Sequence, residues 1–160
     1  MSTIGFDTSN YTTSTAWTDG KTDINVRQIL YVKDGERGIR QSDGVFQHMK
    51  LMPVMYEKLS EQIDFKDVKA VGVSTRPRCV EGSYMPVFLA GEGYAKVVAN
   101  TLGVPLYEFS HQDGHIMAGI YSSGSFELLE NDFISVHLSG GTTEILKSRY
   151  NGFHFDNEII

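Results

Sequence analysis

Apolar and polar residues alternate through the first thirty positions of the chain and then settle into a longer period. Alternation at residues 3–8, 12–18 and 24–33 predicts three strands, joined by polar turns at residues 8–11 and 19–21. Between residues 45 and 63 apolar side chains recur every three or four positions, which predicts a helix with one buried face. The chain therefore opens as a β-meander followed by a helix that covers it.

The middle of the chain predicts further strands and helices in alternation. Residues 68–75 form a short apolar stretch typical of a central strand, residues 87–102 predict a helix, and residues 104–109 predict another strand. A third helix begins near Ser110 or His111, with Ser110 as its N-cap. The order β-β-β-α-β-α-β-α is typical of a mixed α/β sheet in which an antiparallel meander is extended by parallel crossovers.

The opening pattern returns near the end of the chain. Ile4, Ser9, Thr12 and Thr13 have the same residue types 130 positions later, at Ile134, Ser139, Thr142 and Thr143. Strands at residues 133–139, 143–149 and 152–158 would repeat the meander, but no covering helices follow them. We therefore predict one lobe at residues 1–130 and the opening strands of a truncated second lobe at residues 131–160, which makes the chain a fragment of a longer protein.

Composition and charge narrow the classes of function. The chain has 160 residues, of which 41% are hydrophobic, enough for a buried core. A net charge of -6 argues against broad, nonspecific nucleic-acid binding but leaves a local basic patch open. The single cysteine, Cys79, rules out an intrachain disulfide and is typical of a reducing cytoplasm. No basic leader or long apolar run is present, so we expect a cytoplasmic protein without a signal peptide or membrane span.

Two histidines one helical turn apart form the most informative motif. His111 and His115 lie on one face of the predicted third helix, where both imidazoles can reach one divalent metal ion. The alternative is a pair of histidines at the surface or cap of a helix. Asp113 between them is a candidate ligand, or a partner that orients a ligand. Gln112 stands where a metalloprotease of the H-E-x-x-H type has its glutamate base, which argues against that class.

Two ligands are fewer than the three that catalytic metal sites usually have. A third must come from His137, from Asp7, from a neighbouring molecule, or from beyond residue 160. His137 alternates with apolar neighbours, so its position also fits a sheet-face residue without a role. Asp7, at the end of the first strand, can hold a metal-bound water or a ligand hydroxyl, or can cap the turn as an Asx-turn.

A glycine turn follows the sixth predicted strand. Glycines let a backbone approach an anion, and the hydroxyls around Gly140 and Gly141 add donors. The alternative is an ordinary hairpin turn. The matching turn at residues 8–13 favours an anion-binding turn, because two facing turns can hold a nucleotide phosphate between them. Arg76 and Arg78 can contact phosphate groups or the RNA backbone, or can simply keep the loop soluble. We expect His48 and His154 to be solvated or half-buried without a functional role.

These motifs together resemble the N-terminal half of the TsaD (YgjD, Gcp) family, bacterial relatives of the Kae proteins that were formerly described as glycoproteases. The similarity rests on Ile4-Gly-Phe-Asp-Thr-Ser9, on His48 before an apolar helix containing Pro53, and on Gly103-Val-Pro-Leu106 before the histidine pair. The last matching motif is Ser139-Gly-Gly-x-Thr143. The resemblance implies the actin/Hsp70/sugar-kinase fold, in which two ribonuclease-H-like lobes enclose a nucleotide cleft.

The resemblance also implies a function. The family transfers a threonylcarbamoyl group from threonylcarbamoyl-AMP to N6 of adenosine 37 in certain tRNAs. It implies iron or zinc at His111 and His115, acting as a Lewis acid. It further implies an adenylate (or ATP) site lined by His137, Leu138, Ser139, Gly140 and Gly141, with Asp7, Ser9, Thr142 and Thr143 as further candidates. Implied partners are tRNA and a TsaB-like protein. The family's aspartate ligand lies in its C-terminal half, so we expect the isolated chain to be nearly inactive.

Four departures from the family pattern indicate a divergent paralogue. They are Asp7 and Asp113 in place of glutamates, Arg76-Pro77-Arg78 in place of Gly-Pro-Gly, and Thr142 in place of histidine. The acyl group and the acceptor therefore stay open. Two alternatives remain: a noncatalytic TsaB-like scaffold, a class that lacks the histidine pair, and an ATP-dependent phosphotransferase of the sugar-kinase type. An uncovered second meander also invites pairing with a second copy of the chain.

Overall fold

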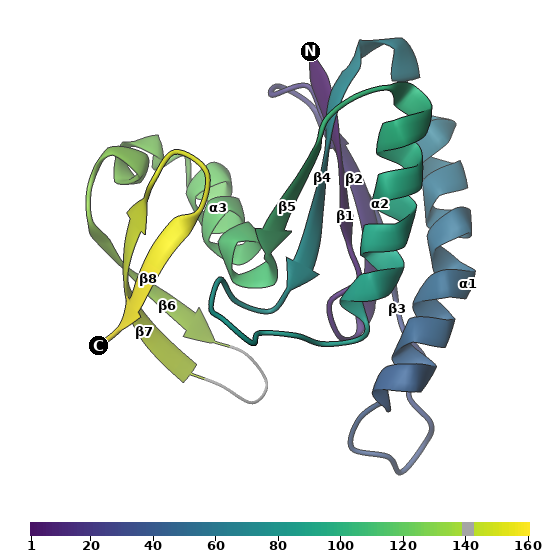
Figure 1. The fold of residues 1–160 in the computed structure, drawn as a ribbon, viewed down its shortest axis with the longest axis horizontal. Helices are drawn as coiled ribbons and strands as arrows, with labels where there is room; N and C mark the ends of the chain where they lie inside the picture. Colours follow the sequence, from purple (N-terminus) through teal and green to yellow (C-terminus); the bar gives the residue numbers. More distant parts are fainter. Residues whose placement is uncertain (139–142) are drawn as a thin grey trace.

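The computed structural model describes residues 1–138 and 143–160. It contains the predicted elements in the predicted order (Figure 1). The first part of the chain comprises β1 (Ser2–Asp7), β2 (Thr12–Thr18), β3 (Asp23–Ile29), α1 (Gln41–Ser60), η1 (Phe65–Asp67), β4 (Val68–Arg76), α2 (Phe88–Leu102), β5 (Leu106–Ser110) and α3 (His111–Ser123). The remainder comprises η2 (Phe126–Glu130), β6 (Phe133–Leu138), β7 (Thr143–Tyr150) and β8 (Phe155–Ile159).

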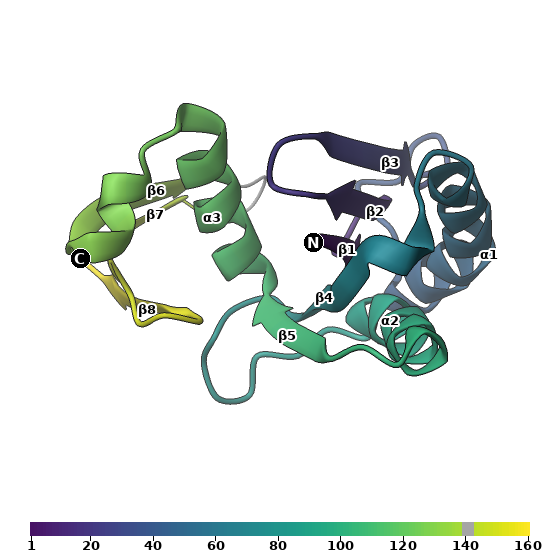
Figure 2. The same ribbon diagram turned by 90° about the horizontal axis from the view of Figure 1, so that it is seen from above.

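A five-stranded mixed sheet organises the first part of the chain. Its strand order is β3-β2-β1-β4-β5, with β1, β2 and β3 antiparallel and with β4 and β5 parallel to β1. Helices α1 and α2 cover one face, whereas α3 lies on the opposite side, toward the second sheet (Figure 2). The predicted fold is confirmed. In the part of the chain that the structure describes, no helix combines the length and apolar character needed to cross a bilayer.

The main core lies between this sheet and helices α1 and α2. Ile4 and Phe6 alternate with more exposed residues along β1 and pack with Val71 and Val73 of β4. The helices contribute a further set of buried side chains: Met52, Leu59, Ala95 and Ala99. Burying a large aliphatic or aromatic side chain contributes about 1.5–3 kcal/mol, so this layer is the main source of stability for the lobe.

A separate three-stranded antiparallel sheet, in the order β6-β7-β8, forms the end of the chain. Alternate residues of β7 are buried, including Leu146, whereas the other face exposes apolar side chains. Ile134, Val136 and Leu138 are 58%, 60% and 72% exposed. Apolar side chains of this meander are thus exposed, and the assignment of residues 131–160 to a truncated second lobe stays a prediction.

Several of the predicted boundaries were wrong, among them the end of β3 and the start of α1. Strand β3 ends at Ile29, because the backbone N–H of Leu30 bonds the carbonyl of Tyr11 and the N–H of Tyr31 bonds the Gln47 side chain. Helix α1 begins at Gln41, four residues before the first apolar residue of the repeat. His48 lies inside this helix, whereas the family resemblance placed it before the helix.

His48 was expected to be solvated or half-buried, and this prediction was wrong. It is fully buried because it lies on the same face of α1 as Met52, Met55 and Leu59, at helical spacings of four, seven and eleven residues. Its Nδ1 lies 2.7 Å from the Thr13 hydroxyl of β2, which satisfies one polar atom of the ring. The helix therefore uses a histidine as part of its inner face.

The burial of His48 predicts a pH-dependent stability. Burial lowers the pKa of His48 below its ordinary value, against smaller opposing effects of the Asn10 backbone and Asp7. Its contribution to stability is therefore present above about pH 6.5, where the unfolded imidazole is neutral, and is lost as the pH falls. We expect His48→Asn, which keeps a partner for Thr13, to flatten the dependence of unfolding free energy on pH by up to about 1.4 kcal/mol per pH unit below pH 6.5. Urea unfolding of both proteins at several pH values measures this, and parallel curves would contradict it.

Candidate metal centre and substrate site

The parallel strands bring the candidate residues to one edge of the main sheet. Strands β1, β4 and β5 are parallel and end at Asp7, Arg76 and Ser110, so their carboxyl ends meet at the same edge. This is the edge at which open α/β sheets usually bind ligands. Ser110 is the N-cap of α3, as predicted. Its hydroxyl accepts from the backbone N–H of Asp113, and the Asp113 carboxylate accepts from the backbone N–H of Ser110, each at 3.0 Å. The capping box fixes His111 as the first residue of the helix.

The two histidines of α3 face one another. Their Nε2 atoms are 2.8 Å apart and their ring centroids are 4.2 Å apart. Nδ1 of His111 lies 2.9 Å from a carboxylate oxygen of Asp7. When that Nδ1 donates to Asp7, Nε2 carries the lone pair that a metal needs. A metal ion with nitrogen bonds of about 2.0–2.1 Å would reach both Nε2 atoms after a small outward turn of the rings.

The charges around this pair favour its metal-binding form. Burial by itself raises the pKa of Asp7, but the hydrogen bond and charge of His111, with hydrogen bonds from Ser74 and Ser9, lower it to about 2. The carboxylate is thus ionised at neutral pH. Burial, followed by the charges of His111 and His137, lowers the pKa of His115. Neutral imidazole is the form that coordinates metal, so both effects suit a cation site.

Both carboxylate oxygens of Asp7 have hydrogen-bond partners. One carboxylate oxygen accepts from the backbone N–H of Ser9 at 2.7 Å and from the Ser9 hydroxyl, which is the Asx-turn expected from the sequence. The other oxygen contacts His111. A single carboxylate therefore shapes the turn after β1 and orients the first residue of α3. A contact of Asp7 with a metal-bound water or a ligand hydroxyl stays a prediction.

His137 lies close to the pair, on the neighbouring strand β6. Its ring centroid is 5.5 Å from that of His115. Its Nδ1 is buried and has no hydrogen-bond partner among residues 1–138 and 143–160. A cavity of about 420 Å³ between α3 and β6 is lined by His115, His137, Leu138 and Ile134, among others. His115 of α3 and His137 of β6 thus border one cavity, and His111 lies next to His115 outside its lining.

The rest of the predicted substrate site can be placed only in part. Ser139, Gly140, Gly141 and Thr142 lie outside the described residues. Thr143 is the first residue of β7, opposite Leu138 on β6, and Ser9 lies in the turn after β1. The facing arrangement of the two turns therefore stays a prediction.

A buried carboxylate that was not predicted from the sequence lies beside His137. Glu144 of β7 forms an ion pair with Arg78 at 2.8 Å, accepts from Gln112 at 3.3 Å and lies 3.8 Å from His137 Nδ1. Arg78, considered above for phosphate or RNA, is thus already paired with a carboxylate. The period of two along β7 places Glu144 on the buried face, which is the signal that could have found it. Its partners come from segments far apart in the sequence.

Asp113 is not brought to the histidine pair. It is two residues from His111, about 200° around the helix, so its carboxylate points elsewhere. Its oxygens accept from Nδ1 of His154 and from the backbone N–H of Phe155, each at 3.2 Å, in addition to the cap at Ser110. His154 is half-buried as expected, but it has a partner that the sequence did not reveal. Asp113 therefore anchors the start of β8 to α3.

The family model for TsaD, tRNA N6-adenosine threonylcarbamoyltransferase, matches residues 35–159. Several relatives carry that enzyme's name, and two of them follow. The protein from Christiangramia forsetii is 33% identical over 98 residues, covering 61% of this chain and 27% of the relative. The protein from Pyrobaculum calidifontis is 28% identical over 144 residues, covering 89% of this chain and 40% of the relative. The chain thus spans less than half the length of these relatives.

Solved structures show the same fold at low sequence identity. YeaZ from Pseudomonas aeruginosa superposes with a TM-score of 0.57 at 11% identity, covering 99% of this chain and 64% of that one. The ethanolamine utilization protein EutJ from Carboxydothermus hydrogenoformans gives a TM-score of 0.52 at 17% identity, covering 99% and 52%. These likenesses concern the fold alone. With the family model matched over most of its length, the chain belongs to the TsaD family.

Proposed function

We propose that this chain is the N-terminal part of a metal-dependent transferase that moves a threonylcarbamoyl group from its adenylate to N6 of a tRNA adenosine. The observation that carries the proposal is the convergence of the His111 and His115 Nε2 atoms, 2.8 Å apart, with Asp7 holding the outer nitrogen of His111. A noncatalytic member of the fold gains nothing from this arrangement. The family model and the curated relatives name the reaction.

The donor set fits iron or zinc. Imidazole nitrogens bind both metals well, and a carboxylate that accepts from the outer ring nitrogen is the usual partner of a metal-bound histidine. When bound, the metal supplies a Lewis acid that polarises the carbamoyl oxygen. Two protein ligands leave room for a third, and we propose that this ligand is an aspartate outside the chain.

The remaining residues bind and orient the reactants in this proposal. His137 and Leu138 border the cavity beside His115, which would receive the adenylate. N6 of the adenosine attacks the carbamoyl carbon, the bond from that carbon to the phosphate oxygen breaks, and AMP leaves with the electron pair. The attacking nitrogen loses one proton to water. Asp7 keeps its charge throughout, because its pKa of about 2 lies far below neutral pH.

The proposed macromolecular partners follow from the net charge of the chain. A net charge of -6 disfavours a broad tRNA contact by this chain alone, so a TsaB-like protein or a local basic patch would supply it. ATP is the alternative nucleotide for the cavity beside His115.

The noncatalytic TsaB-like scaffold is the second candidate function, supported by the likeness of fold to YeaZ. It requires no metal at the histidine pair.

Transfer of labelled threonylcarbamoyl from its adenylate to tRNA tests the proposal, using the protein as its organism produces it. Loss of a Lewis acid worth several kcal/mol predicts that His115→Ala lowers kcat by about a thousandfold. Tyr121→Phe, a change on the exposed side of the same helix, serves as the matched control and should keep full activity. Undiminished transfer by His115→Ala would remove the histidines from the reaction, and inactivity of the unmodified protein with its partners present would favour the scaffold.

A further inference from the structure

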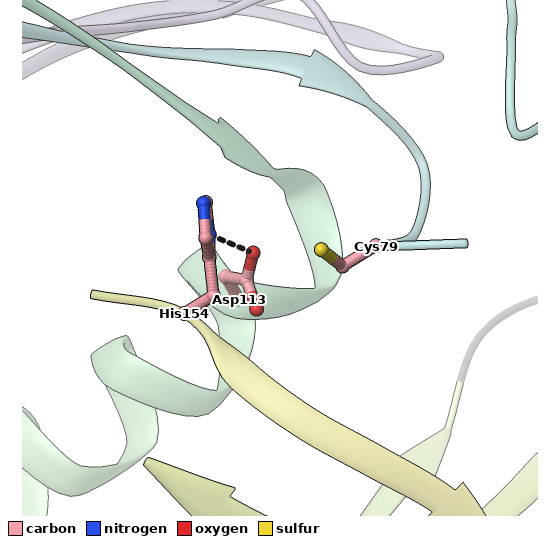
Figure 3. Close-up of side chains that lie close together, drawn as sticks. All are labelled: Cys79, Asp113 and His154. Carbon is pink, nitrogen blue, oxygen red and sulfur yellow. Dashed lines mark hydrogen bonds and ion pairs between the residues drawn. The ribbon is translucent and has the colours of Figure 1, made fainter. Parts of the chain in front are cut away.

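Three side chains with metal-binding atoms meet on the far side of α3 from the histidine pair. Cys79 comes from the loop after β4, Asp113 from α3, and His154 from the turn before β8 (Figure 3). One donor atom of each lies within 4.8 Å of the donor atoms of the other two. The sequence gives no hint of this cluster, because the three residues are separated by long stretches of chain.

The distances suit a small divalent ion. Zinc bonds of about 2.0–2.3 Å to oxygen, nitrogen and sulfur place neighbouring ligand atoms roughly 3.3–3.8 Å apart in a tetrahedron. A contraction of about 1 Å within the 4.8 Å cluster would reach that geometry, and Cys79 lies on an exposed loop that can adjust. Cysteine, aspartate and histidine are all established zinc ligands, and the thiolate makes softer metals such as zinc preferred over magnesium or calcium.

Asp113 has the capacity for one more partner. Its Oδ2 atom accepts from Ser110 and His154, whereas its Oδ1 accepts from Phe155. A carboxylate offers about four lone-pair sites, so one remains on Oδ1. A deeply buried carboxylate is costly unless it is paired, and Asp113 is only 3% exposed. The hydrogen bonds from Ser110 and Phe155 hold the carboxylate in place, so a metal would meet a ligand that is already oriented. On metal binding, the proton of the neutral His154 ring moves from Nδ1 to Nε2, and Nδ1 coordinates the ion in place of its hydrogen bond to Asp113.

The arrangement does not resemble a cysteine nucleophile with its base. The Asp113 carboxylate lies between the imidazole of His154 and the sulfur, and the imidazole bonds the carboxylate (Figure 3). The guanidinium of Arg76 donates to the Cys79 sulfur at 3.7 Å, which is the kind of outer hydrogen bond that a metal-bound thiolate receives. A thiolate, a carboxylate and a neutral imidazole together balance a charge of +2.

We propose that Cys79, Asp113 and His154 form a second metal site, selective for zinc, distinct from the site at His111 and His115. An ion there would bridge the loop after β4, helix α3 and the start of β8. The two sheets would then be joined by a metal in addition to their few side-chain contacts. A fourth position stays open to water, because Cys79 is exposed. This site is independent of the proposed transferase activity.

Cobalt titration of the purified chain tests the site directly. A thiolate bound to Co²⁺ gives an intense near-ultraviolet charge-transfer band, and Cys79 is the only cysteine of the chain, so the band reports this site alone. The band is expected to saturate by about two equivalents, because the His111 and His115 pair also takes up cobalt, and it should be displaced by Zn²⁺. It should persist in a His111→Ala, His115→Ala variant and vanish in Cys79→Ser, a change of one exposed atom. His154→Ala should weaken zinc binding by at least about 10–100-fold, the range seen on losing even an outer partner.

A second measurement guards against variants that fold poorly. In the His111→Ala, His115→Ala protein, saturating Zn²⁺ should slow alkylation of Cys79 at least about tenfold relative to metal-free protein, and His154→Ala added to it should restore the fast rate. Two results would overturn the proposal: absence of the band in the unmodified chain, or a band and a protection that His154→Ala leaves unchanged. Neither depends on transfer activity, so failure here leaves the proposed function untouched.

Discussion

Alanine at both His111 and His115 is expected to abolish the iron or zinc binding that we propose for the candidate centre. Both Nε2 atoms face one point, and the chain offers no other imidazole pair in that position among its described residues. Metal content should be measured in a Cys79→Ser background, so that the second proposed site does not contribute. Bound metal per chain should fall to background after dialysis, because no pair of neutral imidazoles remains to hold it.

Asp7→Asn should weaken metal binding at the same centre, but less than alanine at both histidines does. Asparagine keeps an oxygen for the Ser9 turn but removes the negative charge that accepts from His111. Loss of such an outer carboxylate lowers metal affinity by about 10–100-fold, well short of the double-alanine effect. Competition with a chelator of known affinity measures it.

Tyr121→Phe, on the outer side of α3, is the matched control for both changes and should bind metal as the unmodified chain does. Equal metal content in the double-alanine protein and the unmodified chain would contradict the assignment of His111 and His115. An Asp7→Asn protein with unaltered affinity would contradict the orienting role of Asp7 alone.

Gly91→Ala is expected to destabilise the lobe by about 1–3 kcal/mol, the usual effect of overpacking a core. A Cβ at Gly91 would lie 2.8 Å from the Thr8 hydroxyl oxygen and 3.3 Å from its methyl group. Thr8 cannot move freely, because it is fully buried, donates to the Val87 carbonyl at 2.8 Å and accepts from the Gly91 backbone at 3.0 Å. Any displacement of Thr8 would also displace Asp7, which precedes it in the chain. Urea denaturation with a constant m-value measures the change.

Gly93→Ala is the matched control, two residues along the same helix. A Cβ at Gly93 meets nothing within 4 Å, so alanine should stabilise the helix by about 0.5–1 kcal/mol. In a Thr8→Ala background the clash at residue 91 is gone, and Gly91→Ala should lose most of its cost. The packing argument fails if Gly91→Ala is as harmless as Gly93→Ala, or if its cost is the same with and without the Thr8 side chain.

Local patterns in the sequence were enough to predict the fold. The period of two in β1 and β2, the three-to-four spacing in α1 and the Ser110 cap of α3 each reflect interactions within a few residues. The motif His111–His115 was found for the same reason, since its spacing is one turn of a helix. His48 was misjudged because the face of α1 that packs against the sheet includes His48 and leaves Met49 exposed, and the sequence alone does not show which face packs.

The sequence alone thus determined the order of the elements, the mixed sheet and the pairing of His111 with His115, because short-range periodicity and capping encode them. Only the tertiary structure decided which residues from distant segments meet. The contact of Asp7 with His111, the ion pair of Glu144 with Arg78, and the cluster of Cys79, Asp113 and His154 all depend on strand order and on the placement of α3. Such contacts join positions that have no regular spacing along the chain, so no local pattern records them.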